Sequence, residues 1–117
     1  MSARLQLSRQ KGFRLPPDAV KIDRTTEYGN PFRVVGPHWW VEFGGWVWRF
    51  PTQEAATAAA VEMHVAWIRL PPQNVLRDRI RLQFRDHRPA CWCALDAPCH
   101  GDTILAIARE PLECGSP

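Results

Sequence analysis

Residues 88–108 read RPACWCALDAPCHGDTILAIA, and their pattern predicts a strand, a loop and a helix in that order. The strand is expected over Ala90–Cys93, a short apolar run that follows the break at Pro89. The helix is expected to begin at Gly101 or Asp102 and to continue through the apolar residues TILAIA. A strand that leads through a loop into a helix indicates a domain of the α/β class.

Two further strands are expected upstream, at Arg4–Ser8 and Ala19–Asp23, where apolar and polar residues alternate. The second strand leads into residues 24–32, RTTEYGNPF, which are rich in polar and turn-forming side chains. Pro31 disfavours the helical region for Asn30, so this segment is predicted to be a loop.

A tryptophan-rich β-hairpin is expected between residues 38 and 50. Gly44-Gly45 separates two runs of strand-forming residues, which is the pattern of a two-residue hairpin turn. Pairing outward from the turn places six side chains on one face: Trp39, Val41, Phe43, Trp46, Trp48 and Phe50. On the other face Trp40 lies opposite Arg49, a favourable cation–π arrangement. The aromatic face is either core covered by a helix or a stacking platform for a base or a partner protein.

Two helices are expected between the hairpin and the last strand. Thr52 is placed to cap a helix that runs to Leu70, where Pro71-Pro72 ends it. Its apolar stripe is Ala56, Ala60, Val61, His64, Trp67 and Ile68. A second helix is expected from Asn74, with Val75, Leu76, Ile80 and Phe84 as its apolar residues and its charged positions in solvent.

Together these elements predict one small α/β domain over residues 1–110, with a short mixed sheet, the hairpin and about three helices. Residues 111–117, which include Cys114, are expected to form a flexible tail. The chain of 117 residues is 45% hydrophobic and 23% charged, which is typical of a soluble globular protein. Its formal net charge of +3 permits a nucleic-acid partner without requiring one.

The first ten residues carry no apolar segment of a secretory signal, and no run approaches the ~20 apolar residues of a membrane span. We therefore expect a cytoplasmic protein with no membrane partner. In that reducing compartment, cysteines are expected to be metal ligands, reactive thiols or packed thiols rather than disulfides.

Three interpretations of the segment Cys91 to Asp102 stay open, since strand ends and helix entrances are where α/β domains place ligand sites. In the first, the segment binds zinc through Cys91, Cys93, Cys99 and His100. Because adjacent residues seldom bind one ion together, three of these four residues are the more natural ligand set. In the second, Cys99 is a reactive thiolate, His100 its acid or base, and Asp102 orients the imidazole or contacts the ligand. In the third, the cysteines are packed small residues. In each, Trp92 is expected to point into the core.

Two motifs together resemble a family of small domains of unknown function from bacteria, especially actinobacteria, and their phages. The motifs are Gly29-Asn30-Pro31-Phe32 and Cys91-Trp92-Cys93 with Pro98-Cys99-His100-Gly101-Asp102. The similarity spans about residues 4–109. The chain departs from the family pattern in its longer hairpin and in Tyr28, where many relatives have tryptophan.

The resemblance implies that the two motifs form one pocket, with Arg24, Tyr28, Asn30 and Gly101 as ligand-binding residues. We expect a nucleotide-like or phosphorylated ligand, with Arg24 at its anion and N–H groups donated from the helix entrance at Gly101-Asp102. Any chemistry would fall to Cys99, His100 and Asp102, and the sequence does not decide whether the protein is an enzyme. The alternative is a non-enzymatic phage or host-protein interaction module, or a nucleic-acid-binding module, in which the Cys/His segment is structural.

Overall fold

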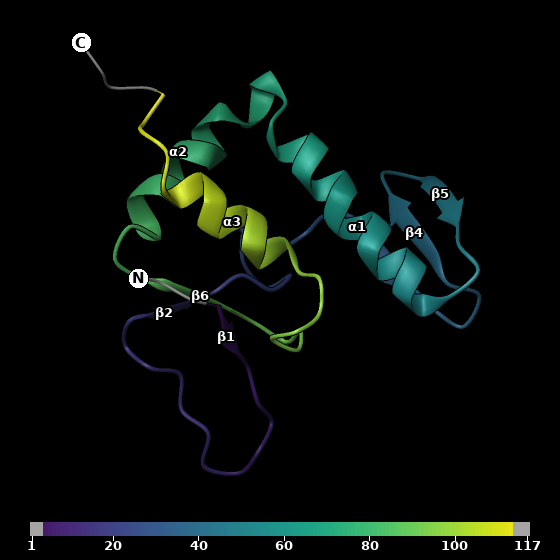
Figure 1. The fold of residues 1–117 in the computed structure, drawn as a ribbon, viewed down its shortest axis with the longest axis horizontal. Helices are drawn as coiled ribbons and strands as arrows, with labels where there is room; N and C mark the ends of the chain where they lie inside the picture. Colours follow the sequence, from purple (N-terminus) through teal and green to yellow (C-terminus); the bar gives the residue numbers. More distant parts are fainter. Residues whose placement is uncertain (1–3, 114–117) are drawn as a thin grey trace.

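A three-stranded parallel sheet forms the base of the fold (Figure 1) in the computed structural model, which describes residues 4–113. Its strands are β1 (Leu5–Gln6), β2 (Ala19–Lys21) and β6 (Arg88–Cys91), in the order β1-β6-β2. Because all three strands run the same way, the loops that follow them leave from one edge of the sheet. The α/β class is thereby confirmed.

Strand β6 begins two residues earlier than predicted, with Pro89 inside the central strand. The N–H of Arg88 and the carbonyl of Ala90 both bond towards the β2 side, to Asp18 and Ile22. The nitrogen of Pro89 therefore faces the β1 side, and β1 begins only at Leu5, opposite Ala90. Among the described residues, proline removes no ladder bond at this position, which is why it is tolerated there.

A second, antiparallel sheet contains the predicted hairpin. Its strands are β3 (Arg33–Val35), β4 (Trp40–Phe43) and β5 (Trp46–Arg49). The strands of residues 4–113 thus form one parallel and one antiparallel sheet where a short mixed sheet was expected. Val41 pairs with Trp48 and Phe43 with Trp46, as predicted. Gly44 and Gly45 have φ values of 54° and 87°, the left-handed conformation that a tight hairpin turn requires.

Helix α1 (Gln53–Ile68) lies between the two sheets (Figure 1). The side chain of Thr52 accepts a hydrogen bond from the N–H of Ala55 at 3.1 Å, which confirms the predicted cap. The buried side of the helix carries Ala56, Ala60, His64 and Ile68. Trp67 packs against two hydrophobic clusters, one that contains Ile22 and Cys91 and one that contains Val41, so α1 joins these two parts of the core.

After α1, a short 3₁₀ turn, η1 (Pro71–Gln73), leads into helix α2 (Asn74–Gln83). The prediction that the charged positions of this helix lie in solvent was wrong for three of them, whereas Ile80 and Phe84 are buried as predicted. Its charged residues Arg77, Asp78 and Arg81 are buried, whereas Val75 is 55% exposed. The guanidinium group of Arg77 donates to carbonyls at the end of α1 and to Glu113. That of Arg81 donates to Asp78, Glu110 and Glu113 through its Nη atoms, while its buried Nε has no partner among the described residues. No local pattern in α2 predicts the two glutamates.

Helix α3 (His100–Ala108) covers the parallel sheet together with α2. Its residues Ile104 and Ile107 are fully buried beside Ile22, Ile80 and Phe84.

None of the helices formed by residues 4–113 has the length and apolar character needed to span a bilayer. The domain boundary at residue 110 stays a prediction. Glu113, three residues beyond it, is hydrogen-bonded to Arg77, while Cys114 lies outside the described residues.

Candidate metal and ligand site

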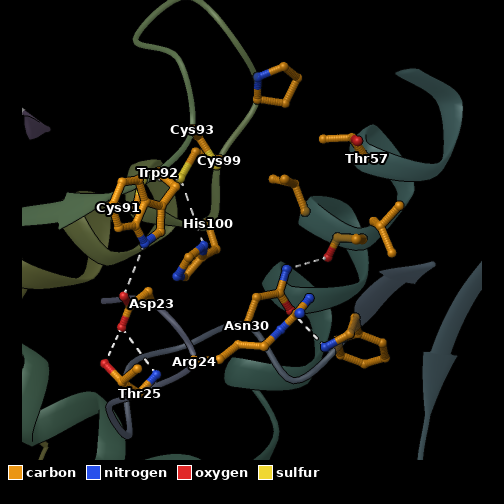
Figure 2. A pocket seen from close by; sticks show the side chains of 15 residues that line it. Asp23, Arg24, Thr25, Asn30, Thr57, Cys91, Trp92, Cys93, Cys99 and His100 are labelled. Carbon is orange, nitrogen blue, oxygen red and sulfur yellow. Dashed lines mark hydrogen bonds between the residues drawn. The ribbon is translucent and has the colours of Figure 1, made fainter. Parts of the chain in front are cut away.

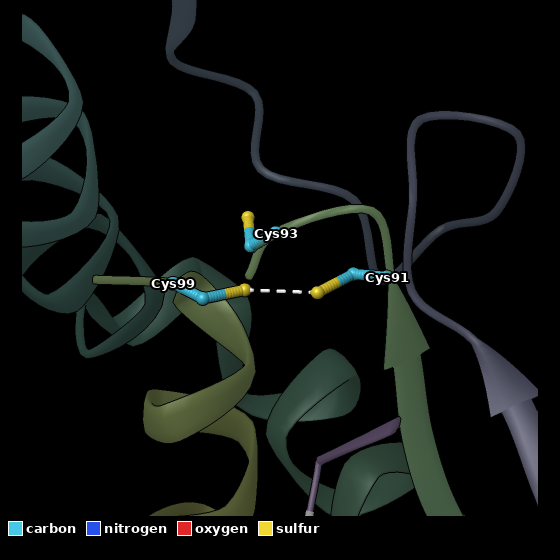
Figure 3. A group of neighbouring side chains, drawn as sticks. All are labelled: Cys91, Cys93 and Cys99. Carbon is cyan, nitrogen blue, oxygen red and sulfur yellow. Dashed lines mark hydrogen bonds between the residues drawn. The ribbon is translucent and has the colours of Figure 1, made fainter. Parts of the chain in front are cut away.

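Three thiol groups converge where β6 ends and α3 begins (Figure 3). The Sγ atoms of Cys91, Cys93 and Cys99 all lie within 4.8 Å of one another, and those of Cys91 and Cys99 are 3.1 Å apart. Cys91 is the last residue of β6, Cys93 lies in the loop, and Cys99 is the N-cap of α3. We call these residues the cysteine triad; soft thiolate ligands in such a group can hold a metal ion such as zinc.

The backbone at the start of α3 supports Cys99. The N–H of Gly101 points at the Cys99 Sγ atom, 3.4 Å away, and the N–H of Asp102 donates to the Cys99 carbonyl. Helix N-termini stabilise negative charge, and here that effect falls on a thiol. The N–H groups that the sequence suggested for a ligand are therefore directed at the triad.

The pKa values of the thiols differ because they bond to one another. Hydrogen bonds from Cys93 and Cys99, together with the nearby Arg4 side chain, hold the pKa of Cys91 well below its ordinary value. The pKa of Cys99 is raised because its thiol bonds to Cys91 and Cys93 and is buried. Of these two thiols, Cys91 is therefore the one in which the thiolate form is favoured.

His100 stands beside the triad without joining it. Its Nε2 atom lies 2.7 Å from the Ile22 carbonyl, and its Nδ1 atom is 3.8 Å from the Cys99 Sγ. A carbonyl only accepts, so Nε2 carries the proton and the Nδ1 lone pair faces the sulfur. Burial holds the pKa of His100 below its ordinary value, which keeps the imidazole neutral. Of the four ligands considered, the structure brings together the three cysteines.

Arg4 secures the loop between Cys93 and Cys99. Its guanidinium group donates to the carbonyls of Ala94, Leu95 and Ala97 at 3.0–3.2 Å and to Asp102 at 3.2 Å. Asp102 consequently faces Arg4, and the Ile22 carbonyl is what orients His100. Gly101 is required at this point, because a Cβ atom there would lie 2.6 Å from Cδ of Arg4.

A pocket of about 360 Å³ opens directly beside the triad (Figure 2). Loops that follow β2 and β6, the start of α3 and one side of α1 enclose it. This position outside the carboxyl ends of parallel strands is typical of ligand sites in α/β proteins. Its lining residues include all three cysteines and His100, the polar residues Arg24, Asn30 and Thr57, and the apolar residues Phe32, Val34, Val61 and Pro98.

Two of the predicted ligand residues line this pocket in different ways. The amide of Asn30 donates to the Ala60 carbonyl and accepts from the Phe32 N–H, so it fixes the loop to α1. Arg24 makes no ion pair with any described residue. Burial and the neighbouring Arg33 hold its pKa below the ordinary value. Arg24 is therefore the cation in the pocket wall that is free to meet an anion.

Trp92 lies in the pocket wall, not in the core as predicted, and is 42% exposed. Its Nε1 donates to Asp23 at 3.3 Å, and the Arg9 guanidinium lies 4.4 Å from its ring centre. Strand β6 ends at Cys91, so the strict alternation that would have buried Trp92 no longer applies. Tyr28 lies elsewhere, with its ring edge-on to Phe84.

Sequence reasoning missed Arg4 and the side of α1 that closes the pocket. Arg4 is 90 residues or more from the groups it binds, and nothing in the N-terminal sequence signals that contact. Thr57 and Val61 follow helical spacing, yet only the packing of α1 shows that they line the same pocket as the triad.

Fold and site together define a small α/β domain with a three-cysteine candidate metal site at the carboxyl edge of a parallel sheet. The chain belongs to the family of the domain of unknown function DUF4326, whose model matches residues 5–110. This membership confirms the resemblance drawn from the two motifs. Neither the curated proteins nor the solved structures contain a significant match to the chain.

Proposed function

We propose that the cysteine triad binds a zinc ion and that a small ligand binds beside it in the pocket. The observation that carries the proposal is the meeting of three sulfur atoms within 4.8 Å at a pocket wall. Zinc–sulfur bonds of about 2.3 Å in a tetrahedron place sulfur atoms about 3.8 Å apart. Cys91 and Cys99, at 3.1 Å, would need to separate by only about 0.7 Å to reach that spacing.

The fourth position of such an ion would open into the pocket. Three protein ligands with one open position are typical of catalytic zinc, whereas structural zinc has four protein ligands. Among residues 4–113 no fourth His, Cys, Asp or Glu joins the triad. A bound zinc ion would supply Lewis-acid chemistry at that position, and His100 beside Cys99 would be the nearest group able to hold a proton.

The ligand is proposed to be nucleotide-like or phosphorylated. The apolar walls at Phe32, Val34 and Val61 suit a flat ring, and Arg24 is the unpaired cation suited to an anionic group. This arrangement is compatible with an enzyme acting on such a molecule and with a domain that only binds it.

Metal analysis and ligand binding test the two parts separately. Protein purified without chelator should carry about one zinc per chain, and Cys93→Ser should lose most of it, while Cys114→Ser should keep it. Nucleoside monophosphates should raise the melting temperature of the wild type and not of Arg24→Gln. Zinc content that is near zero in the wild type, or unchanged by Cys93→Ser, contradicts the metal proposal.

A second candidate function rests on the hairpin. Trp46 is 70% exposed and Trp48 37%, although Phe43 and Trp39 on the same face pack against α1. The aromatic face is therefore core along β4 and open along the edge strand β5. An exposed tryptophan pair on the edge strand β5 is suited to contact a protein or a nucleic-acid base, which favours an interaction module.

A double variant that carries both Trp46→Ser and Trp48→Ser tests this second candidate. The interaction-module function predicts that the variant stays folded and metal-bound and loses binding of a single-stranded oligonucleotide or of a host protein. Unchanged binding by the double variant would remove this candidate.

A further inference from the structure

We propose that the ligand's phosphate is held between Arg24 and Arg33, in a shallow depression next to the pocket. The depression has a volume of about 250 Å³ and shares Arg24 and Asn30 with the pocket. Its remaining lining residues are Thr26, Gly29, Pro31 and Arg33. This inference rests on the proposed ligand-binding function and assigns its anionic half to a second compartment that includes a residue outside both sequence motifs.

The two arginines form a cationic pair without a partner. Neither makes an ion pair with a residue of the range 4–113, and Arg33 is the charged neighbour that lowers the pKa of Arg24. Arg4, Arg69, Arg77, Arg79, Arg81 and Arg88, in contrast, each have a carboxylate within 3.2 Å. Two like charges held together without a counterion favour an anion between them.

Glu42 is the carboxylate nearest to this pair in the sheet. It lies opposite Arg33 across the β3–β4 ladder, and its Oε2 atom accepts a hydrogen bond from Trp40 Nε1 at 3.1 Å. Glu42 is thus held towards Trp40, and Arg33 stays available on the side of the depression.

The floor of the depression is closely packed, and its polar side chains bond to neighbouring backbone groups. A Cβ atom on Gly29 would lie 2.6 Å from the Asp23 carbonyl oxygen, so the loop is tightly folded at this point. The hydroxyl of Thr26 bonds to Lys21 and Tyr28, and the amide of Asn30 to Ala60 and Phe32. The two guanidinium groups are therefore the charged donors that remain for a ligand, which selects a phosphate over a neutral hydroxyl.

The two compartments define the shape of the ligand. A phosphate at the arginine pair leaves the apolar pocket for a ring and directs the far side of that ring to the cysteine triad. A phosphomonoester of a compact ring system, such as a nucleoside monophosphate, has this arrangement. The arginine pair would then determine specificity for phosphate, and any reaction at the triad would occur on the ring.

Isothermal titration with inorganic phosphate, the four common ribonucleoside monophosphates and their nucleosides tests the assignment on the full chain. The wild type should bind at least one monophosphate about ten times more tightly than its nucleoside, as expected for two charge-assisted contacts. Arg33→Gln should abolish that preference, and Arg14→Gln, at an exposed loop position, should keep it. Circular dichroism and zinc content verify that each variant is folded.

The outcomes separate this inference from the proposed function. One outcome is that Arg24→Gln weakens monophosphate binding while Arg33→Gln and Arg14→Gln bind the monophosphate equally well. That outcome overturns the arginine pair and leaves the pocket proposal intact. Absence of binding by every monophosphate and by phosphate overturns both. Equal affinity for nucleoside and monophosphate overturns the phosphate compartment alone.

Discussion

Cys99 connects the local structure of the chain with its candidate chemistry. As the N-cap of α3 it occupies a position usually held by serine, threonine or aspartate. Its sulfur accepts from the Gly101 N–H on one side and contacts Cys91 on the other. A serine at this position would cap the helix as well or better, so the presence of cysteine points to a requirement for sulfur.

Oxidation of the metal-free protein is the first prediction at the scale of residues. The Sγ atoms of Cys91 and Cys99 lie in contact, so removal of metal should let an oxidised dithiol reagent convert this thiol pair to a disulfide. Thiol titration should then show the loss of two thiols in chelator-treated protein and of none in zinc-loaded protein. Equal thiol loss in both would contradict metal ligation by this pair.

Gly29→Ala is a second prediction at the same scale. The added methyl group would meet the backbone of Asp23 and Arg24, at 2.6 and 2.9 Å, and backbone cannot move away as a side chain can. We expect a loss of about 1–3 kcal/mol in the free energy of unfolding, typical of overpacking. Urea denaturation measures it, and a midpoint equal to that of the wild type would show that the loop is looser than described.

At the scale of elements, the hairpin, α1 and α3 could be predicted because their signals are local. The Gly44-Gly45 turn and the Thr52 cap depend on residues only a few positions apart. Helix α2 could not be predicted in its orientation, because the glutamates that bind Arg77 and Arg81 lie 29–36 residues further along the chain. Charged residues in α2 look like a solvated face until those partners are known.

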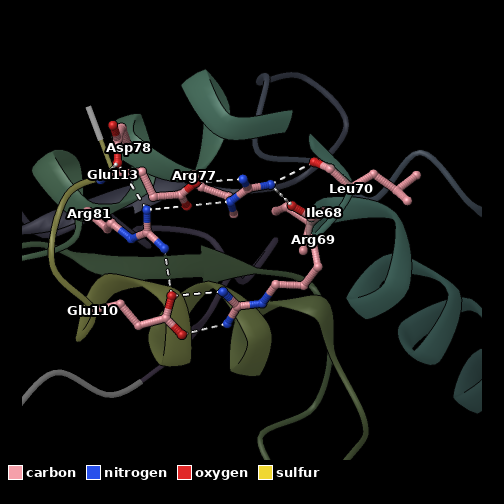
Figure 4. Close-up of polar contacts among 8 residues, drawn as sticks. All are labelled: Ile68, Arg69, Leu70, Arg77, Asp78, Arg81, Glu110 and Glu113. Atoms are coloured by element: carbon pink, nitrogen blue, oxygen red, sulfur yellow. Dashed lines mark hydrogen bonds and ion pairs between the residues drawn. The ribbon is translucent and has the colours of Figure 1, made fainter. Parts of the chain in front are cut away.

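The buried charges of α2 lead to a prediction about stability (Figure 4). Arg81, whose side chain is almost fully buried, bonds to Asp78, Glu110 and Glu113. Arg81→Ala leaves these carboxylates without their shared cation and should cost about 2–4 kcal/mol.

Arg79 in the same helix provides the matched control, because its ion pair with Glu27 is exposed. Arg79→Ala should cost less than about 1 kcal/mol. Both free energies of unfolding come from the same denaturation experiment. Similar losses for the two variants would contradict the structural role assigned to Arg81.

At the scale of the whole molecule, acid should release the segment after α3 from α1 and α2. Hydrogen bonds from Arg69 and Arg81 lower the pKa of Glu110 to about 2, and those from Arg77 and Arg81 do the same for Glu113. A carboxyl whose pKa is lowered by folding stabilises the fold above its ordinary value of 4.5. That stabilisation is lost as the pH falls from about 4.5 towards 2.

Thermal unfolding between pH 6 and pH 2 measures this effect, and Glu110→Gln is the comparison. The variant should be less stable than the wild type at pH 6, and the difference should shrink as the pH approaches 2. A difference that stays constant over this range would exclude the ion pairs of Glu110 as its source.

The candidate site could be predicted only in part from the sequence. The spacing of Cys91, Cys93 and Cys99 around a strand end and a helix start indicates that they converge, and the structure confirms it. Three other features depend on loops packed against distant elements. They are the direction of Trp92, the hydrogen bonds from Arg4 to the loop carbonyls, and the proximity of Arg24 to Arg33. Local periodicity carries no information about such contacts, so they emerge only from the assembled fold.

The central claim is that the cysteine triad holds a metal ion with one position open to the pocket. X-ray absorption spectroscopy at the zinc edge of the purified full chain tests it most directly. We predict three sulfur neighbours at about 2.3 Å and one oxygen or nitrogen neighbour at about 2.0 Å. The oxygen or nitrogen distance should change when a bound ligand displaces it. Four sulfur neighbours, or a protein that contains no zinc and binds none when it is added, would contradict the account.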